Sequence, residues 1–210
     1  MTETVWRAAV RAVVFDLGGV VVDVHRERML AALAEGSARP QADVEAALFM
    51  AAPGERSLSD QYHAGLLDSD TFCNRLATAL GRISTAQVQA AWLAMLGAER
   101  EDMLAAIAAL RARYRVACFS NTNALHWEHM ACHYRLLPLF DPAGASHHWR
   151  LLKPDPVVFD RLAASLGLPP AACLLVDDLP ENTAAARSCG WQALDWNGDP
   201  ACRAALQLLL

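Results

Sequence analysis

Short apolar runs that stop at polar or glycine residues alternate along this chain with longer segments of helical periodicity. The clearest run is Ala-Val-Val-Phe at 12–15, which ends at Asp16. A run this short and this apolar is typical of a buried strand. Runs of the same kind lie at 114–119, 172–176 and 192–196, and a weaker one lies within 139–145.

Between these runs the apolar residues recur at helical spacing. The helices predicted in this way are 100–113, 123–134, 156–166 and 180–189. The third has the clearest limits, because Asp155 is a typical N-cap, Pro156 suits a first turn and Gly167 is a typical stop. Strands alternating with helices indicate an α/β fold, a doubly wound parallel sheet covered on both faces.

Residues 25–97 interrupt this alternation. Their apolar helical segments lie near 27–35, 41–51, 57–66, 70–80 and 85–96, and we find no strand run there. The sequence therefore predicts an all-helical domain at 25–97, inserted between the first two strands of a core that comprises 1–24 and 98–210.

Composition excludes several classes of protein. Hydrophobic residues make up 54% and charged residues 20%, as in ordinary globular chains. The net charge of −5 and the absence of a long basic run argue against nucleic-acid binding. No apolar stretch approaches the roughly 18–20 residues of a membrane span. Residues 1–14 lack the pattern of an export signal, and the six cysteines form no C-x-x-C pair, so we expect a cytoplasmic protein.

Four polar stretches follow strands or precede helices. Their candidate residues are Asp16, with Gly18 and Gly19; Ser120 and Asn121; Lys153; and Asp177 and Asp178. The carboxyl ends of parallel strands form the edge of a sheet where ligands bind. Lys153 is the single lysine beside 17 arginines, which suits a site that needs a compact ammonium. Three carboxylates against one ammonium would repel one another, and Mg²⁺ would relieve that repulsion.

In this order the residues resemble the four motifs of the haloacid dehalogenase (HAD) superfamily. The motifs are Asp-x-x-Gly-x-x-x-Asp at 16–23, Ser-Asn at 120–121, Lys-Pro at 153–154 and Asp-Asp-x-x-x-Asn at 177–182. The resemblance covers nearly the whole chain, and it implies a Rossmann-like core with the helical insertion as a small cap over the site. The details are similar to the bacterial branch that contains α-D-glucose-1-phosphate phosphatases.

The resemblance also implies residue roles. Asp16 would attack phosphorus and form an aspartyl-phosphate. Ser120 and the backbone of Asn121 would bind the phosphoryl oxygens, together with the glycine loop at Gly18 and Gly19. Lys153 would stabilise the charged group and orient the nucleophile.

The same resemblance implies a set of magnesium ligands. They are the carboxylates of Asp16 and Asp178 and the backbone carbonyl of Gly18, with Asp177 in the outer sphere.

One departure from the family pattern concerns proton transfer. Gly18 stands where most phosphatases of the family have a second aspartate, which serves as general acid and base, and Val20 stands where threonine is usual. The proton for the leaving group would then come from the substrate, from water or from a side chain such as His25.

These residues lead to three hypotheses. The first is a Mg²⁺-dependent phosphatase of a small phosphorylated metabolite, for example a sugar phosphate. The second is a 2-haloacid dehalogenase, which the Asp177–Asp178 pair argues against because those relatives work without metal. The third is a phosphate-binding regulatory protein that lost turnover with its general acid. The oligomeric state is left open.

Other residues have simpler interpretations. His126, His129 and His133 share one helical face, and we expect them at the surface or partly buried. His147 and His148 precede Lys153 and could line its pocket. Two placements are left open: Trp92 faces either the pocket or the helical core, and the C-terminal leucines at 206–210 pack on the sheet or form a partner surface.

Overall fold

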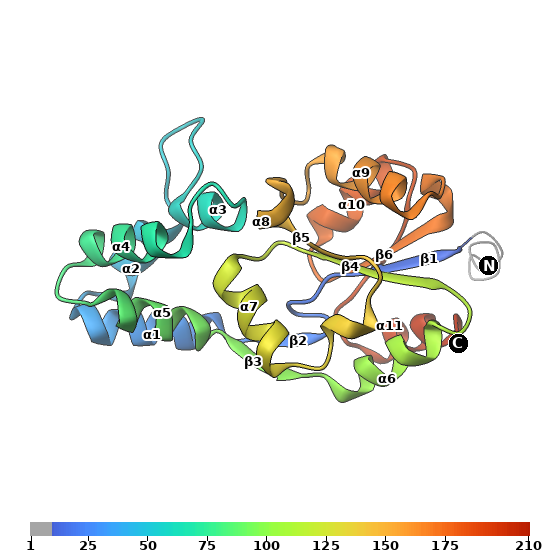
Figure 1. Cartoon of the computed structure of the whole chain (residues 1–210), viewed down its shortest axis with the longest axis horizontal. Helices are drawn as coiled ribbons and strands as arrows, with labels where there is room; N and C mark the ends of the chain where they lie inside the picture. The colour runs from blue at the N-terminus through green and yellow to red at the C-terminus, as the bar shows by residue number, and fades with distance from the viewer. Residues whose placement is uncertain (1–9) are drawn as a thin grey trace.

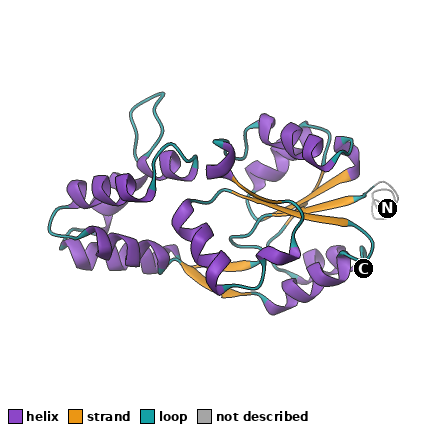
Figure 2. Cartoon of the chain, in the orientation of Figure 1, coloured by secondary structure: helices purple, strands orange, loops and turns teal. Residues whose placement is uncertain are grey.

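The computed structural model describes residues 10–210, and its core is a five-stranded parallel sheet between two layers of helices (Figures 1 and 2). The strands are β1 (Ala12–Phe15), β4 (Arg115–Ser120), β5 (Ala143–Ala145), β6 (Cys173–Asp177) and β7 (Gln192–Asp195), in the order β5-β4-β1-β6-β7. The predicted doubly wound sheet is confirmed. Residues 1–9 of the expected core, with most of the segment examined for an export signal, lie outside the described residues.

The central strand β1 is buried on both faces, which explains why its sequence is apolar throughout. Val13 and Phe15 face α6 (Glu101–Leu110), α7 (Ala124–His133) and α11 (Pro200–Gln207). Ala12 and Val14 face α9 (Pro156–Leu166). The helix α10 (Pro180–Ser188) covers the same face as α9 (Figure 1).

The ends of α9 follow the sequence prediction. The carboxylate of Asp155 accepts a hydrogen bond from the backbone N–H of Val157 at 2.9 Å. The helix stops at Gly167, which adopts a left-handed conformation with φ of 63°.

Five helices form a separate cap beside the sheet, at the left of Figure 1. They are α1 (Arg26–Ser37), α2 (Gln41–Phe49), α3 (Leu58–His63), α4 (Ser69–Leu80) and α5 (Thr85–Leu93). The cap has its own apolar core, in which Tyr62 stacks on Phe72 with ring centroids 4.2 Å apart. Trp92 is 1% exposed and lies in this core, which decides between its two possible placements.

The cap joins the sheet through a two-stranded antiparallel ribbon of β2 (Val22–Val24) and β3 (Leu96–Glu99). The prediction of no strand within 25–97 was therefore wrong at its end. The segment Leu-Gly-Ala-Glu has neither β-branched residues nor a clear alternation, so only its pairing with β2 makes it a strand. The backbone N–H of His25 donates to the carbonyl of Met95 at 2.7 Å, which extends the pairing towards the cap.

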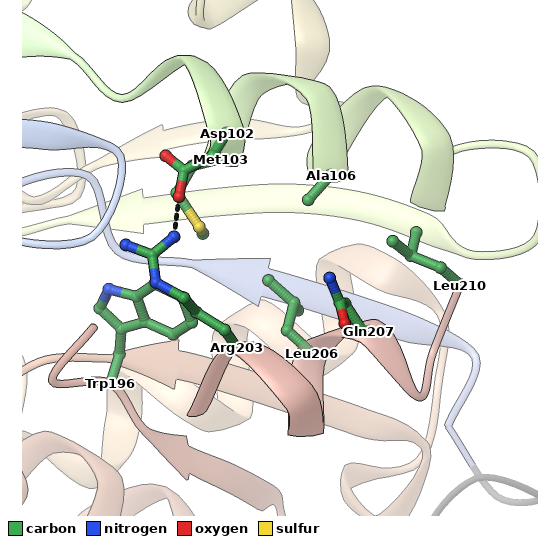
Figure 3. Close-up of a pocket in the computed structure, with 8 residues that line it drawn as sticks. All are labelled: Asp102, Met103, Ala106, Trp196, Arg203, Leu206, Gln207 and Leu210. Atoms are coloured by element: carbon green, nitrogen blue, oxygen red, sulfur yellow. Dashed lines mark hydrogen bonds and ion pairs between the residues drawn. The ribbon is translucent and has the colours of Figure 1, made fainter. Parts of the chain in front are cut away.

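The C-terminal segment forms α11, which the sequence analysis did not predict. Leu206 and Leu209 are buried in the core beside the sheet, whereas Leu210 is 42% exposed. A cavity of about 90 Å³ lies between α6 and α11. Figure 3 shows the side chains that line it, among which the guanidinium of Arg203 donates to the carboxylate of Asp102. The leucines therefore mainly cover the sheet.

Further short elements complete the described chain. They are α8 (Ser146–Trp149) and the 3₁₀ turns Leu137–Leu139 and Pro170–Ala172. Within residues 10–210, no helix combines the length and apolar character that crossing a bilayer requires.

A network of neutral histidines connects the cap to α7. The amide nitrogen of Asn123 lies 3.2 Å from Nε2 of His63 and 3.1 Å from Nδ1 of His126. Because an amide –NH₂ can only donate, both ring nitrogens accept. The opposite ring nitrogens then donate, that of His63 to the carbonyl of Ser59 and that of His126 to the carbonyl of Trp92.

The placement of His126 corrects the expectation of a surface or partly buried side chain. It is 3% exposed, and burial lowers its pKa from 6.5 to about 3. His129 is half-buried and His133 exposed, as expected. The difference arises because the cap covers the first turn of α7 and leaves its last turn open.

We predict that His126 makes folding stability depend on pH. Its folded pKa is about 3 against 6.5 ordinarily, so its contribution is complete above pH 6.5 and is lost as the pH falls towards 3. Between about pH 7 and about pH 5 the wild type should lose about 2 kcal/mol more stability than His126→Gln. Urea unfolding at the two pH values measures this difference.

The control is His133→Gln, which removes an exposed histidine of the same helix and should lose stability in parallel with the wild type. Equal losses in wild type and His126→Gln would contradict the prediction.

Candidate functional site

Three strand ends bring the polar residues to one edge of the sheet. Asp16 follows β1, Ser120 is the last residue of β4 and Asp177 is the last residue of β6. The parallel register pairs Phe15 with both Cys118 and Val176, so Asp16 lies level with Asp177 and Ser120 lies one residue further along. One carboxylate oxygen each from Asp16, Asp177 and Asp178 lies within 4.8 Å of the other two.

The ammonium of Lys153 lies between two of these carboxylates. Its Nζ is 3.1 Å from Oδ1 of Asp16 and 2.5 Å from Oδ2 of Asp177, and the residue is 3% exposed. Burial alone would lower the pKa of Lys153, but Asp16 and Asp177 outweigh burial and raise it. The amine is therefore held as a cation inside the protein.

Both oxygens of Asp177 are engaged by groups inside the protein. Its Oδ2 faces Lys153, and its Oδ1 accepts from the backbone N–H of Leu179 at 3.0 Å and from Nδ2 of Asn182 at 2.9 Å. The residue is completely buried. It orients the lysine, whereas Asp16 and Asp178 present their carboxylates to the cavity.

Asn121 positions Lys153 from the other side. Its side-chain nitrogen donates to the carbonyl of Lys153 at 2.8 Å, and its side-chain oxygen accepts from the N–H of Lys153 at 2.9 Å. The sequence analysis assigned only the backbone of Asn121 to phosphoryl binding and missed this contact. Nothing in the sequence connects the two residues, because they lie 32 positions apart and meet only through the order of the strands.

The glycine loop lets the backbone approach Asp178. Gly19 has φ of +72°, and a Cβ there would lie 2.1 Å from Oδ2 of Asp178. Both the conformation and the space therefore require glycine. At Gly18 a Cβ would lie 3.2 Å from a methyl group of Val24, so that side chain occupies the space beside the loop.

These side chains border a cavity of about 400 Å³ between the sheet edge and the two cap linkers, which are the segments 22–25 and 95–100 that contain β2 and β3. It is lined by Asp16, Gly18, Gly19, Asp23, Val24, His25, Arg100, Asn121, Asp178 and Leu179. Ser120, Lys153 and Asp177 lie buried beneath it. His147 and His148 do not line the cavity and pack against Trp127 instead.

Arg100 is a cavity residue that the sequence analysis missed. Its Nε donates to the carboxylate of Asp23 at 2.7 Å, and its Nη1 donates to the carbonyl of Gly19 at 2.5 Å. It ties both cap linkers to the glycine loop. In the sequence it is one arginine among many, and only the pairing of β2 with β3 gives it this position.

Two carboxylates of the site, Asp16 and Asp178, have raised pKa values. Burial raises the pKa of Asp16, against the lowering effect of Lys153. Burial, and then the charges of Asp16 and Asp177, raise the pKa of Asp178 to about 6. Oδ1 of Asp16 is also buried and lacks a hydrogen-bond partner of good geometry. Clustered carboxylate oxygens of this kind fit a hard divalent cation such as Mg²⁺, with Asp16 and Asp178 as the available ligands.

Comparison with known proteins identifies relatives of this chain. The D-ribitol-5-phosphate phosphatase of Bacteroides thetaiotaomicron is 25% identical over 213 residues, covering 96% of this chain and 98% of the relative. A solved structure described as a predicted HAD-like family hydrolase from Porphyromonas gingivalis is 27% identical, with a TM-score of 0.81, covering 96% of this chain and 98% of that one.

A HAD family enzyme from Bacteroides thetaiotaomicron, solved with magnesium and inorganic phosphate, has the same fold. Its TM-score is 0.77 at 22% identity, covering 90% of this chain and 96% of that one. The family described as haloacid dehalogenase-like hydrolase matches residues 10–190. Because this match spans four of the five strands of the sheet, the cap and the residues that line the cavity, the chain belongs to the haloacid dehalogenase-like hydrolases.

Proposed function

We propose that this protein is a Mg²⁺-dependent phosphatase that hydrolyses phosphomonoesters of small metabolites, such as sugar or sugar-alcohol phosphates. The observation that carries the proposal is the Asp16 carboxylate, which faces the cavity with a buried ammonium 3.1 Å away on one side and the Asp178 carboxylate on the other. A nucleophile, a fixed positive charge and a pair of oxygens suited to a cation are the parts that phosphoryl transfer requires.

In the proposed reaction, a carboxylate oxygen of Asp16 attacks phosphorus and forms an aspartyl-phosphate, which water then hydrolyses. Lys153 stabilises the charge on the phosphoryl oxygens and keeps Asp16 oriented. Ser120, at the end of β4, and the backbones of Asn121, Gly18 and Gly19 bind the remaining phosphoryl oxygens. Such a preorganised set of charges and donors provides most of the rate acceleration in reactions of this type.

For the cation, we propose the carboxylates of Asp16 and Asp178 and the backbone carbonyl of Gly18 as ligands. Asp177, whose two oxygens are engaged by Lys153, Leu179 and Asn182, acts behind them in the outer sphere. Bound there, Mg²⁺ would neutralise phosphoryl charge in the transition state.

The division of the chain supports a small substrate. We propose that 1–24 and 98–210 form the catalytic core and that 25–97 form a cap that closes over the cavity. A closed cap excludes water and leaves space for a compact molecule only. The name of the Bacteroides relative, a ribitol-phosphate phosphatase, is consistent with an alkyl phosphate in a cavity of about 400 Å³.

We predict phosphate release from phosphomonoesters only when Mg²⁺ is present. The panel contains p-nitrophenyl phosphate, ribitol 5-phosphate, glycerol 3-phosphate and glucose 6-phosphate, assayed with Mg²⁺ or with EDTA. Asp16→Asn should reduce release to background, because the amide cannot attack phosphorus. The matched control is Asp160→Asn, an exposed aspartate of α9, which should retain full activity.

No release from any of these esters would contradict the proposal. Halide release from a 2-haloacid that EDTA leaves unchanged would indicate a dehalogenase instead. Tight binding of a metabolite phosphate by calorimetry, with no turnover over hours, would indicate a binding protein.

A second prediction concerns the cation. The raised pKa of Asp178, about 6 against an ordinary 3.8, means that the folded protein holds a proton that the unfolded chain has lost. Without metal, this group therefore lowers stability as the pH rises from about 4 to about 6. Asp178→Asn should melt at a higher temperature than the wild type at about pH 7 without metal, because it removes that repulsion.

Addition of Mg²⁺ should raise the melting temperature of the wild type and of Asp160→Asn but not that of Asp178→Asn. Differential scanning calorimetry with and without Mg²⁺ measures both effects. An equal Mg²⁺ shift in Asp178→Asn would show that the cation binds elsewhere.

A further inference from the structure

We propose that His25 donates the proton to the leaving oxygen and later accepts one from the attacking water, which makes it a catalytic residue on the cap linker. The inference rests on the proposed phosphatase function and adds to it the source of the proton. An expelled alkoxide needs a proton in the transition state, and a positioned acid commonly accelerates such steps by roughly 10²–10⁴.

The groups that line the cavity leave few candidates for this proton. Asp16 is committed as the nucleophile, and Asp178 is proposed to hold the cation. Asp23 is paired with Arg100 at 2.7 Å, and a guanidinium does not release its proton. The imidazole of His25 lines the same cavity, and histidine is the side chain that most often serves as general acid and base.

The ring of His25 is held in a defined orientation. Its Nδ1 lies 3.1 Å from a carboxylate oxygen of Glu27 on α1, and its backbone N–H is bonded to Met95 across the linkers. The other charged groups around it are Asp23 on β2 and Arg100 after β3. With Nδ1–H directed at a carboxylate, Nε2 is the nitrogen free to exchange a proton with substrate or water.

A glycine makes room for this end of the ring. A Cβ at Gly97 would lie 2.7 Å from Nε2 of His25 and 2.9 Å from Cβ of Asp23. The ring therefore lies against β3 in space that any side chain at position 97 would fill. The side chain of His25 is 29% exposed and lines the cavity, so water reaches the ring.

The glycine loop supplies no acid of its own. Gly18 carries no side chain, and the methyl group of Val24 lies 3.2 Å from the place of its absent Cβ. The space beside Gly18 is thus occupied by Val24 of β2, and the residue that follows Val24 is His25. The acid is supplied from the linker instead of from the loop.

The proposed reaction has two steps. A carboxylate oxygen of Asp16 forms a bond to phosphorus while the bond from phosphorus to the ester oxygen breaks. The electron pair leaves with that oxygen, which takes the proton from Nε2 of the His25 imidazolium and departs as the alcohol. Water then attacks the aspartyl-phosphate, its proton passes to the neutral Nε2, and inorganic phosphate and the Asp16 carboxylate are released.

The test compares leaving groups that do and do not need a proton. In the presence of Mg²⁺, kcat/KM is measured for p-nitrophenyl phosphate, whose phenolate leaves unaided, and for the alkyl phosphate of the panel that the wild type hydrolyses fastest. His25→Gln should lose roughly 10²–10⁴-fold on the alkyl phosphate and less than about tenfold on the aryl phosphate. The control His133→Gln should change neither value.

Two further variants address the geometry. Gly97→Ala keeps the imidazole but crowds Nε2, so it should reproduce the selective loss on the alkyl phosphate. Glu27→Gln removes the carboxylate at Nδ1 and should cause a smaller loss of the same selectivity. His25 makes no side-chain cap at the start of α1, so its replacement should leave the fold intact, as circular dichroism would verify.

The results of this test distinguish the proposed phosphatase activity from the proposed role of His25. A wild type that hydrolyses neither ester overturns the phosphatase assignment, and the role of His25 with it. An active wild type whose His25→Gln variant loses both activities equally, or neither, overturns the role of His25 alone. A wild type that hydrolyses only the aryl phosphate also overturns that role while leaving the phosphatase activity in place.

Discussion

The buried ammonium of Lys153 holds together a sheet edge that would otherwise repel itself. Asp16, Asp177 and Asp178 place three carboxylates within 4.8 Å of one another, where burial weakens their solvation. One cation between Asp16 and Asp177 offsets part of this repulsion. Removal of one partner from such a buried pair typically costs about 3–5 kcal/mol, because the other charge is left uncompensated.

The rest of the site is arranged in two layers around this ion pair. The lower layer consists of buried groups that fix Lys153, namely Asn121 at its backbone and Asp177 at its ammonium, with Asn182 behind. The upper layer consists of the groups that face the cavity, among them Asp16 and Asp178. The buried groups of the lower layer hydrogen-bond with one another, whereas the carboxylates of Asp16 and Asp178 face the cavity.

The cap linkers, like the sheet, position residues of the site. Pairing of β2 with β3 places Asp23 beside Arg100, and Arg100 in turn holds the carbonyl of Gly19 in the loop that approaches Asp178. Attachment of the cap and the shape of the glycine loop are therefore linked through one guanidinium. The same pairing positions His25 against Gly97 at the rim of the cavity.

Much of the fold was predictable from local sequence, because its signals are local. The strand at 12–15 and helix α9, with Asp155 as cap and Gly167 as stop, depend on residues only a few positions apart. The helix α11 has local signals of the same kind, with Asp199 as N-cap and Pro200 in the first turn, and the sequence analysis overlooked them. The strand β3 and the burial of His126 were not predictable in this way. Each depends on a partner that is distant in the chain: β2 for the strand and the cap for His126.

The sequence by itself determined which residue types lie at the ends of the strands. Apolar periodicity defines those strands, and Asp16, Ser120 and Asp177 follow or end them. Only the tertiary structure decided which groups each of these side chains contacts. Whether an oxygen of Asp177 faces a lysine or a cavity, or the side chain of Asn121 faces a phosphate or a backbone, depends on packing between segments far apart in the chain. No local pattern encodes those distances, because they follow from the order of the strands and the fit of the cap.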